Sequence, residues 1–460
     1  MQLRPVGRSF YYIPQTVDNF HALGIENSQG KQYNESRRER DIGRKVRVRC
    51  LRAVVSGRRY MKKRVSLLLI TIVISLFALI ILSSCNSSRL IGGKIVEDTT
   101  DFFDPMQSKP NRKYVQEPII EVGDWKLQKV YLTDDISNQA IVYRAVEYTC
   151  PGENMIIPAQ YEGIPIGYFN ADTVINTSTF IKNVYYEGDI SSWCNILFED
   201  YYPLMGDRNL YINNELITEL TIPDGVEKIC PNAFYAWKGT KVVIPGSVKR
   251  IYDRAFFCCE KLTSVTLNEG LRTIGNYCFY NCAKLAEINI PQSVTAIGSS
   301  AFEKCGKIKN IALTGKIRKI EDRTFSNCAS LENIVLPATL KTIGEGAFYK
   351  CASIDNIVVP GEVIKIGTKA FFRCTKLENV TIGSKVDYIG IDVFADCGIL
   401  KTITFADTKD WYSSVKYNEE TEQNDRSTWG GKSADVSDPA NNASEMKKQN
   451  NKCWYRNKNQ

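Results

Sequence analysis

Histidine is almost absent from this chain of 460 residues, and its one copy, His21, lies in a basic N-terminal stretch. Imidazole is the side chain that most proton shuttles and many zinc sites require near neutral pH. Beyond residue 21 the chain therefore cannot build a Ser-His-Asp or Cys-His catalytic site, or a histidine-ligated zinc site. We expect a protein that is not an enzyme, with no metal and no cofactor. A hydrolase that uses only carboxylates is the less favoured alternative.

A basic excess is also lacking from most of the sequence, although the formal net charge is +8. Residues 1–64 hold 16 Lys or Arg and 5 Asp or Glu, whereas the remaining residues hold 43 basic and 46 acidic side chains. A domain that binds nucleic acid usually carries a basic patch or an overall basic charge. We therefore expect no nucleic-acid partner, and we interpret the basic stretch as the flank of a membrane segment.

A long hydrophobic run extends from Val65 to Leu82, and its 18 residues carry no charge. The basic residues 62–64 come directly before it, as in a secretory signal. The residues that follow, Ser83-Ser84-Cys85, complete a segment that resembles the bacterial lipobox, so Cys85 is the candidate lipidation site. An uncleaved anchor helix is the alternative. In both cases we expect an exported protein that is held at a membrane, through a lipid or an anchor helix.

The composition divides the chain into segments. Met61 offers an alternative translation start, which would leave residues 1–60 outside the protein. The expected segments are a basic leader over 1–60, a lipoprotein signal or anchor helix over 61–84, a polar tether over 85–113, a β-rich N-terminal cap with a degenerate repeat over 114–180, a repeat region over 181–411, and a loosely ordered polar C-terminal tail with aromatic contacts over 412–460.

Internal repetition dominates the region from Val226 onward, where eight copies begin with Val, Leu or Ile at spacings of 22 or 23 residues. Each copy has an Ile three residues later and a Phe eight residues later. After Phe234 in the first copy, the phenylalanine column continues as Phe256, Phe279, Phe302, Phe325, Phe348, Phe371 and Phe394. Three residues further on, seven copies form a cysteine column of Cys259, Cys282, Cys305, Cys328, Cys351, Cys374 and Cys397.

The seven copies with the cysteine then continue with a Leu or Ile, and each copy ends in an alternating strand, such as Leu331-x-x-Ile334-x-Leu336, which Pro337 ends. One copy is too small to bury its own apolar residues, but stacked copies bury them in continuous columns. Glycines such as Gly275 and Gly344, directly after the isoleucine, indicate a turn. The sequence predicts a β-rich repeat solenoid, a leucine-rich-repeat-like stack of units of about 23 residues. The Ala-Phe-x-x-Cys segments are expected to form short helical turns or bends.

The cysteine column permits three interpretations. Metal ligands 23 residues apart would form a line rather than a tetrahedron, which disfavours a metal site. Disulfides between neighbouring copies are conceivable in an exported protein, but equivalent side chains in a stack point the same way, and seven is an odd number. We therefore expect these cysteines to fill the core as small hydrophobic residues, together with the phenylalanine column.

The repeat resembles the BspA-like class of leucine-rich repeats. The resemblance rests on the motif Ile-Gly-x-x-Ala-Phe-x-x-Cys, as in Ile343 to Cys351 and Ile297 to Cys305, and it covers residues 181–411. Trp237 replaces the cysteine of the first copy, and Tyr252 replaces the glycine of the second. The resemblance implies an adhesive protein of the bacterial cell surface that binds host matrix proteins or other surface proteins. It implies no catalytic residues, and it does not identify the ligand.

The outward positions of the strands are the candidate partner-binding residues. A central apolar stretch with polar ends fits a partner-binding face. The alternatives are that β-branched residues simply favour strands and that stacked asparagines satisfy one another. An envelope scaffold without a host ligand is the alternative function. The candidates are Thr266, Asn289, Ala312, Val335, Val358 and Thr381, with a neighbouring asparagine column of Asn310, Asn333, Asn356 and Asn379.

Overall fold

The computed structural model describes residues 117–132, 140–150, 152–177, 180–313, 316–414, 432–448 and 452–456. By its contacts the chain divides into two units, 1–100 and 101–460, and all described residues belong to the second. The hydrophobic run from Val65 to Leu82 and the candidate lipidation site Cys85 lie outside the described residues. Within the described part, no helix combines the length and hydrophobicity that crossing a membrane would need.

The first described strands form a mixed sheet at the N-terminal end of the unit. Many of its apolar residues, among them Trp125 and Leu127, face the core and are almost fully buried. The central path of the sheet runs through β1 (Ile119–Val122), β2 (Trp125–Tyr131), β3 (Ile141–Cys150), β6 (Ile164–Phe169) and β5 (Gln160–Tyr161), with β7 (Val174–Thr177) paired to β3 and β9 (Leu197–Phe198) paired to β6.

A second sheet leads into the repeats. The degenerate repeat is strand β4, which pairs in parallel with β8, and β8 pairs in parallel with β10. Trp193 lies on the short helix α3 (Ile190–Asn195) and is fully buried. Its indole Nε1 donates to the Ala233 carbonyl at 2.9 Å, which joins this region to the first coil. The strands are β4 (Asn154–Ile157), β8 (Asn183–Tyr186), β10 (Asn209–Ile212) and β11 (Glu215–Leu216).

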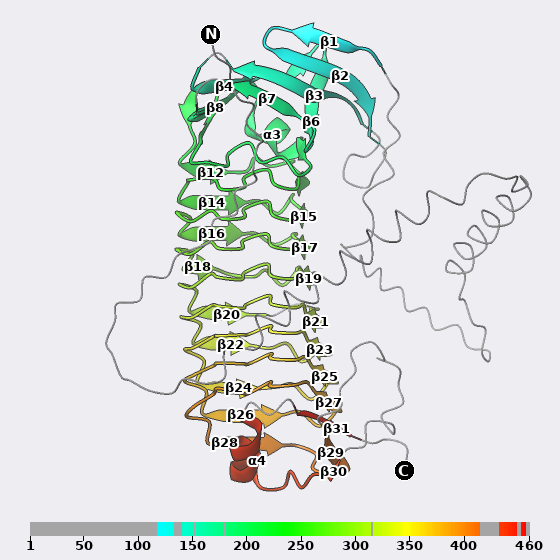
Figure 1. Cartoon of the computed structure of the whole chain (residues 1–460), viewed down its shortest axis with the longest axis vertical. Coiled ribbons are helices and arrows are strands. Elements are labelled where there is room, and N and C mark those ends of the chain that lie inside the picture. The colour runs from blue at the N-terminus through cyan, green and yellow to red at the C-terminus, as the bar shows by residue number, and fades with distance from the viewer. Residues whose placement is uncertain are drawn as a thin grey trace, which may run out of the picture. The chain divides into compact units, whose positions relative to one another are not determined.

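The repeats form a β-solenoid in which each copy makes one coil and contributes one strand to each of two ladders (Figure 1). Neighbouring strands within each ladder are parallel, and their partners are 22 or 23 residues apart, as in Val242 with Val265. The first ladder consists of β12 (Glu219–Thr221), β14 (Lys241–Ile244), β16 (Ser264–Leu267), β18 (Glu287–Ile288), β20 (Asn310–Ala312), β22 (Asn333–Val335), β24 (Asn356–Val358), β26 (Asn379–Ile382) and β28 (Thr402–Phe405). The second consists of β13 (Lys228–Ile229), β15 (Arg250–Ile251), β17 (Thr273–Ile274), β19 (Ala296–Ile297), β21 (Lys319–Ile320), β23 (Thr342–Ile343), β25 (Lys365–Ile366) and β27 (Tyr388–Ile389).

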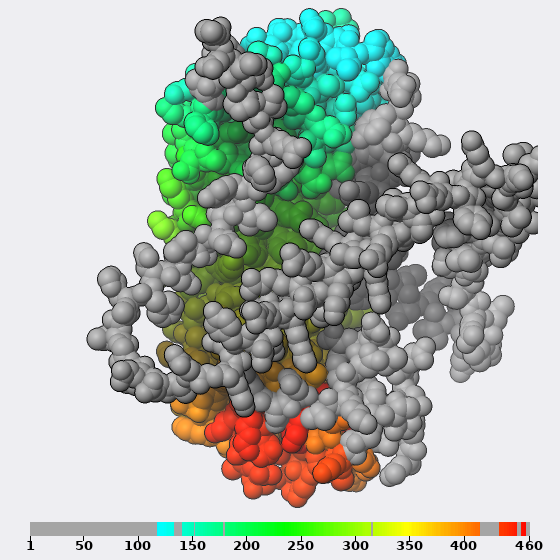
Figure 2. All heavy atoms as spheres, viewed as in Figure 1, coloured from blue at the N-terminus to red at the C-terminus, as the bar shows by residue number. Residues whose placement is uncertain are grey.

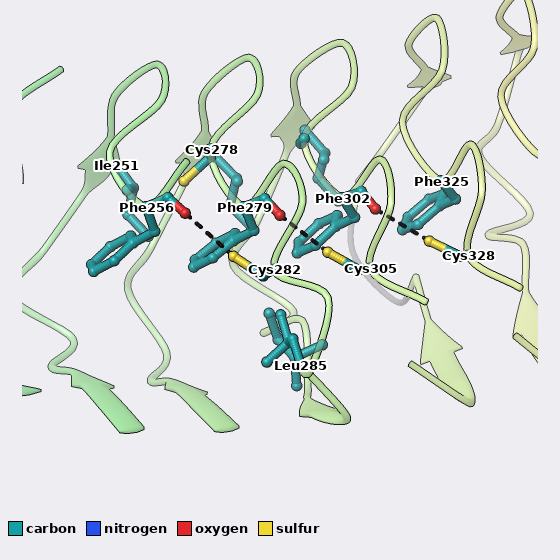
Figure 3. Packing of buried hydrophobic residues seen from close by; sticks show 14 of the residues in the cluster. Ile251, Phe256, Cys278, Phe279, Cys282, Leu285, Phe302, Cys305, Phe325 and Cys328 are labelled. Carbon is teal, nitrogen blue, oxygen red and sulfur yellow. Dashed lines mark hydrogen bonds between the residues drawn. The ribbon is translucent and has the colours of Figure 1, made fainter. Parts of the chain in front are cut away.

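The phenylalanine and cysteine columns run through the centre of this stack (Figure 3). Every member of both columns is fully buried. The rings of successive phenylalanines lie 5.1–5.6 Å apart, with planes within 13° of parallel. Each coil therefore completes the core of its neighbours, and the colours of Figure 2 follow one another in sequence order along the stack.

The Phe–Cys segments are turns without helix, which agrees with the bend rather than with the short helical turn that the sequence allowed. In each of the eight coils the residues three and seven positions after the isoleucine have φ between 54° and 65°, and we call these the left-handed positions. Such residues interrupt an α-helix. The geometry directs alternate N–H groups to the next coil: the amides of Arg254, Phe256 and Cys258 donate to its carbonyls at 2.7–2.9 Å.

The glycines after the isoleucine serve a different purpose from the one expected. Gly275, Gly298, Gly344, Gly367 and Gly390 do not have positive φ. A Cβ atom at any of them would lie 2.5–2.7 Å from a backbone nitrogen of the preceding coil. These glycines therefore permit close approach between coils, whereas the left-handed turns fall at other residues.

The C-terminal segment was expected to be loosely ordered, but its described residues form a cap. Strand β31 (Cys453–Arg456) pairs antiparallel with β27 and with β29 (Trp411–Ser414), which also pairs with β30 (Lys432–Ser433). Helix α4 (Pro439–Met446) packs beside β28 at the end of the first ladder. The cap forms because Met446 and Trp454, although isolated in a polar sequence, are buried against the last coil.

Candidate functional site

The outward side chains of the first ladder form an exposed face with an apolar centre, which we call the strand face. Alternation along each strand puts Ile311, Ile357 and Val380 in the core and directs their neighbours outward. Val335 is 59% exposed and Val358 is 65% exposed, which is unusual for side chains of this size. All six predicted positions are exposed: Thr266, Asn289, Ala312, Val335, Val358 and Thr381.

The asparagine column runs beside the strand face, and some of its side chains form hydrogen bonds with one another. Asn333 Nδ2 donates to Asn310 Oδ1 at 2.8 Å, and Asn379 Nδ2 donates to Asn356 Oδ1 at 2.9 Å. The hydroxyl of Thr402 continues the series by donating to Asn379 Oδ1 at 2.8 Å. An asparagine amide has two N–H donors and two acceptor positions. Each of these exposed side chains therefore keeps capacity to bond an incoming partner.

The sequence analysis missed a second asparagine ladder, on the strands that precede the regular repeats. Asn183 Nδ2 donates to Asn154 Oδ1 at 2.8 Å, and Asn209 Nδ2 donates to Asn183 Oδ1 at 2.9 Å. The spacings here are 29 and 26 residues, so a search at a period of 23 does not find them. An asparagine directly before an apolar strand residue is the signal that could have done so.

Charged residues lie on the other side of the asparagine column. The residues directly before three of the asparagines are Glu332, Asp355 and Glu378, and only Glu378 has an ion pair among the described residues, with Lys401 at 2.6 Å. Lys309 precedes the fourth asparagine, Asn310, so the apolar centre of the strand face is bordered first by amides and then by three carboxylates and one ammonium group. An arrangement of this kind suits a partner that presents apolar and basic groups together.

The cysteine column offers no reactive chemistry. None of the thirteen cysteines of the described residues is in a disulfide, and those of the column are fully buried. Burial raises the pKa well above its usual value for Cys282, Cys305, Cys328, Cys351 and Cys374, which keeps these thiols neutral. Among the described residues, no group of three or more acidic, cysteine or histidine side chains is arranged to hold a metal ion.

The match to a family model agrees with this architecture. Residues 207–329 and 295–420 match the model of the BspA type leucine rich repeat region. A leucine rich cell surface protein from Faecalibacterium prausnitzii is 18% identical, with a TM-score of 0.34, over 64% of this chain and 96% of that protein. A leucine-rich repeat protein from Bacteroides ovatus is 22% identical, with a TM-score of 0.38, over 63% of this chain and 71% of that protein. No curated protein sequence matches the chain.

Proposed function

Because this chain is a BspA-like leucine-rich repeat protein, we propose that it binds another protein through its strand face at the outside of the cell. The observation that carries the proposal is the exposure of Val335 and Val358 on adjacent coils of a well-packed sheet. Soluble proteins rarely leave contiguous apolar surface open to water without a use for it. The buried core holds the strands of this face in place. Binding a partner therefore costs little conformational entropy in the backbone.

The surroundings of the valines indicate the chemistry of the partner. The asparagines beside them can form hydrogen bonds at the rim, and Glu332 and Asp355 add negative charge beyond it. Interfaces typically combine an apolar centre with a polar rim of this kind. The proposed partner presents an apolar ridge flanked by Lys or Arg.

Export and membrane attachment are part of the proposal. The support is the sequence from Lys62 to Cys85, with its basic flank, hydrophobic run and terminal cysteine. Mass spectrometry of the mature N-terminus tests it directly. A diacylated Cys85 would establish the lipid anchor, an intact hydrophobic run would establish the anchor helix, and a mature protein without either would contradict membrane attachment.

A single substitution tests the strand face. Ala312→Glu places a charge at the edge of the apolar centre, and Ala329→Glu makes the same change at an exposed turn outside the face. The immobilised full chain is probed with purified extracellular-matrix proteins and with proteins of its own envelope. We expect Ala312→Glu to lower affinity about tenfold and Ala329→Glu to have little effect. Equal binding by both folded variants would rule out the strand face.

The same assay separates adhesion from the scaffold role. If the immobilised chain retains only envelope proteins, and Ala312→Glu abolishes that retention, the result would favour a scaffold that uses the strand face within the envelope. Retention of matrix proteins would favour adhesion.

A further inference from the structure

Basic residues are concentrated at the left-handed positions of the coils. Of the sixteen such positions six are basic, all between the coil of Ile251 and that of Ile366, and two are acidic, Asp392 and Asp396 in the last coil. This bias contrasts with the chain beyond residue 64, where acidic residues slightly outnumber basic ones. The six residues are Arg254, Lys304, Arg323, Lys350, Lys369 and Arg373.

The backbone conformation gives no reason for long basic side chains at these positions. Left-handed φ is unfavourable for most L-residues and is best tolerated by Gly and Asn. The fold accepts those residues, because Asn281, Asn327 and Gly346 occupy equivalent positions. Lysine and arginine are therefore present despite a conformational cost, and unfavourable conformations of this kind are often kept for function.

Aromatic side chains lie between the two left-handed positions and stack from coil to coil. The Tyr235, Phe257 and Tyr280 rings lie 4.7 Å apart in sequence order, with planes within 12° of parallel. Tyr349 and Phe372 form a similar pair at 5.3 Å. Because the ring faces cover one another, only the ring edges are accessible to solvent. The edge of an aromatic ring carries partial positive charge.

The basic side chains contact these rings and share one surface with them, which we call the turn face. Lys304 Nζ lies 5.0 Å from the centroid of the Tyr280 ring, and Lys350 Nζ lies 5.4 Å from that of Tyr349. Arg373 lies at 5.3 Å from the Phe372 centroid. Cations and ring edges together give the turn face a positive potential.

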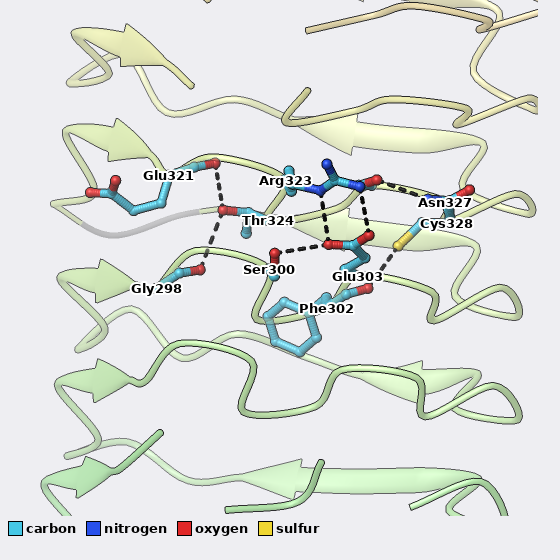
Figure 4. A network of polar contacts seen from close by, with 10 residues as sticks. Gly298, Ser300, Phe302, Glu303, Glu321, Arg323, Thr324, Asn327 and Cys328 are labelled. Carbon is cyan, nitrogen blue, oxygen red and sulfur yellow. Dashed lines mark hydrogen bonds and ion pairs between the residues drawn. The ribbon is translucent and has the colours of Figure 1, made fainter. Parts of the chain in front are cut away.

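Few carboxylates oppose this charge. Glu303, buried within the aromatic column, accepts from Arg323 Nε at 3.2 Å and from Ser300 Oγ at 2.8 Å (Figure 4). Asp396 pairs with Arg373 at 3.0 Å. Among the described residues the remaining four, Arg254, Lys304, Lys350 and Lys369, form no ion pair.

Asp253, Asp322 and Glu345 lie just before the first left-handed position of their coils; Glu345 is exposed, whereas the first two accept backbone hydrogen bonds from the next coil. Asp253 Oδ1 accepts the Asn276 amide at 2.8 Å, and Asp322 Oδ1 accepts the Glu345 amide at 2.7 Å. These carboxylates hold neighbouring coils together. Asp253 and Asp322 therefore have a structural role, whereas the four basic side chains make no comparable contact between coils.

We propose that the turn face binds a linear acidic polysaccharide, whose sulfate or carboxylate groups lie along the row of basic side chains. Successive coils are separated by about 4.8 Å, and five of the six coils from that of Ile251 to that of Ile366 carry at least one of these cations, so the row presents positive charge repeatedly along an extended polymer. Arg and Lys form charge-assisted hydrogen bonds with such anions. The turn face and the strand face have no residue in common, and this binding is independent of the proposed protein partner.

The geometry disfavours two other anionic partners. Single-stranded nucleic acid stacks its bases on open aromatic faces, and these ring faces are covered by one another and by cations. A membrane surface is bound by apolar side chains that insert between lipids. No described residue of the turn face is a strongly exposed large apolar side chain.

Lysine footprinting of the full chain tests the proposal site by site, so that the basic leader cannot obscure the result. The protein is acetylated with and without dextran sulfate, and each lysine is quantified by mass spectrometry. We expect acetylation of Lys304, Lys350 and Lys369 to slow at least about fivefold. The exposed lysines of another column, Lys261, Lys284 and Lys307, should change little. Equal protection of both groups would overturn the proposal.

A pair of variants supplies the second measurement. One replaces Arg254, Lys304, Lys350 and Lys369 by Asn, which suits the left-handed conformation and should preserve folding. The control replaces Lys261, Lys284, Lys307 and Lys376 by Asn, with the same loss of charge. We expect the first variant to lose about tenfold more affinity for dextran sulfate than the control. Equal losses, or stronger wild-type binding to neutral dextran, oligothymidine or phosphatidylglycerol vesicles than to dextran sulfate, would refute it.

Discussion

The thiol of Cys305 donates a hydrogen bond to the carbonyl oxygen of Phe279 in the preceding coil, with a distance of 3.1 Å from Sγ to O. The same bond recurs between consecutive coils from Cys259 to Cys397, at 3.1–3.3 Å. Cysteine in this column therefore does more than fill space, because it also provides a donor to a carbonyl that lies in the core. This second role explains why an aliphatic residue of similar size is not an equivalent choice.

Cys305→Ala removes both the sulfur atom and this donor. We expect the free energy of unfolding to fall by about 1–2 kcal/mol, through a small cavity and a weakened hydrogen bond. The half-buried Cys258 is the matched control, and Cys258→Ala should cost less than about 0.5 kcal/mol. Urea titration followed by circular dichroism measures both. A column cysteine that tolerates Ala as well as Cys258 does would contradict the structural role of the thiol.

Alkaline pH should destabilise the solenoid. Burial raises the pKa of seven thiols well above the usual value, namely Cys194, Cys278, Cys282, Cys305, Cys328, Cys351 and Cys374. A thiol whose folded pKa is raised contributes stability that is complete below the unfolded pKa and is lost above it, because the unfolded form ionises first. Each such thiol lowers stability by about 1.4 kcal/mol per pH unit above roughly 9.

The measurement is the urea midpoint between pH 7 and pH 10.5, with a reducing agent present. The contribution of these thiols to the free energy of unfolding should stay constant up to about pH 8 and should then fall steeply. Cys305→Ala should show a shallower decline than the parent protein, because one ionising group has been removed. An alkaline slope that is unchanged in this variant would argue against thiol ionisation as the cause.

The buried columns could be predicted from the sequence because each one repeats a single residue type at a fixed spacing. Phe302 and Cys305 had to face inward once the copies were stacked, and alternation around Ile334 placed Val335 outside. The turns could not be predicted in the same way. Left-handed φ at Lys304 is not a preference of lysine, but a consequence of the hydrogen bonds between coils.

The ends of the stack and the turn face depend on tertiary contacts that have no period. Asn442 lies in a polar segment, and its role exists only because the edge of β28 offers carbonyl groups there. The contact between Lys304 and the Tyr280 ring likewise becomes visible only when the turn geometry is known. Sequence periodicity thus identified the core and the strand face, but it gave no information on the cap or the turn face.

Gly344→Ala tests the close approach of neighbouring coils. The added Cβ would lie 2.7 Å from the backbone nitrogen of Asp322 and 2.7 Å from the carbonyl carbon of Glu321. Backbone atoms cannot move aside as a flexible side chain would, so we expect a loss of about 2–3 kcal/mol. Gly306→Ala is the control, since nothing lies within 4 Å of its added Cβ. Thermal unfolding compares the two, and similar melting temperatures would show that the coils can separate at little cost.

Asn442→Ala tests whether the C-terminal cap holds the last coil closed. Asn442 is buried, and its Nδ2 donates to the carbonyls of Ile403 at 3.0 Å and Val436 at 2.9 Å. Removing the amide leaves both carbonyls without this donor, which should cost about 2 kcal/mol. The adjacent Asn441 is exposed, so Asn441→Ala should be nearly neutral. Because each coil contacts mainly its neighbours, the loss of stability should be local.

Hydrogen exchange measures how far the loss extends along the stack. Exchange should accelerate in β26 and β28 and remain unchanged in β14 and β16. Uniform acceleration along the stack would mean instead that the cap stabilises the solenoid as a single cooperative unit.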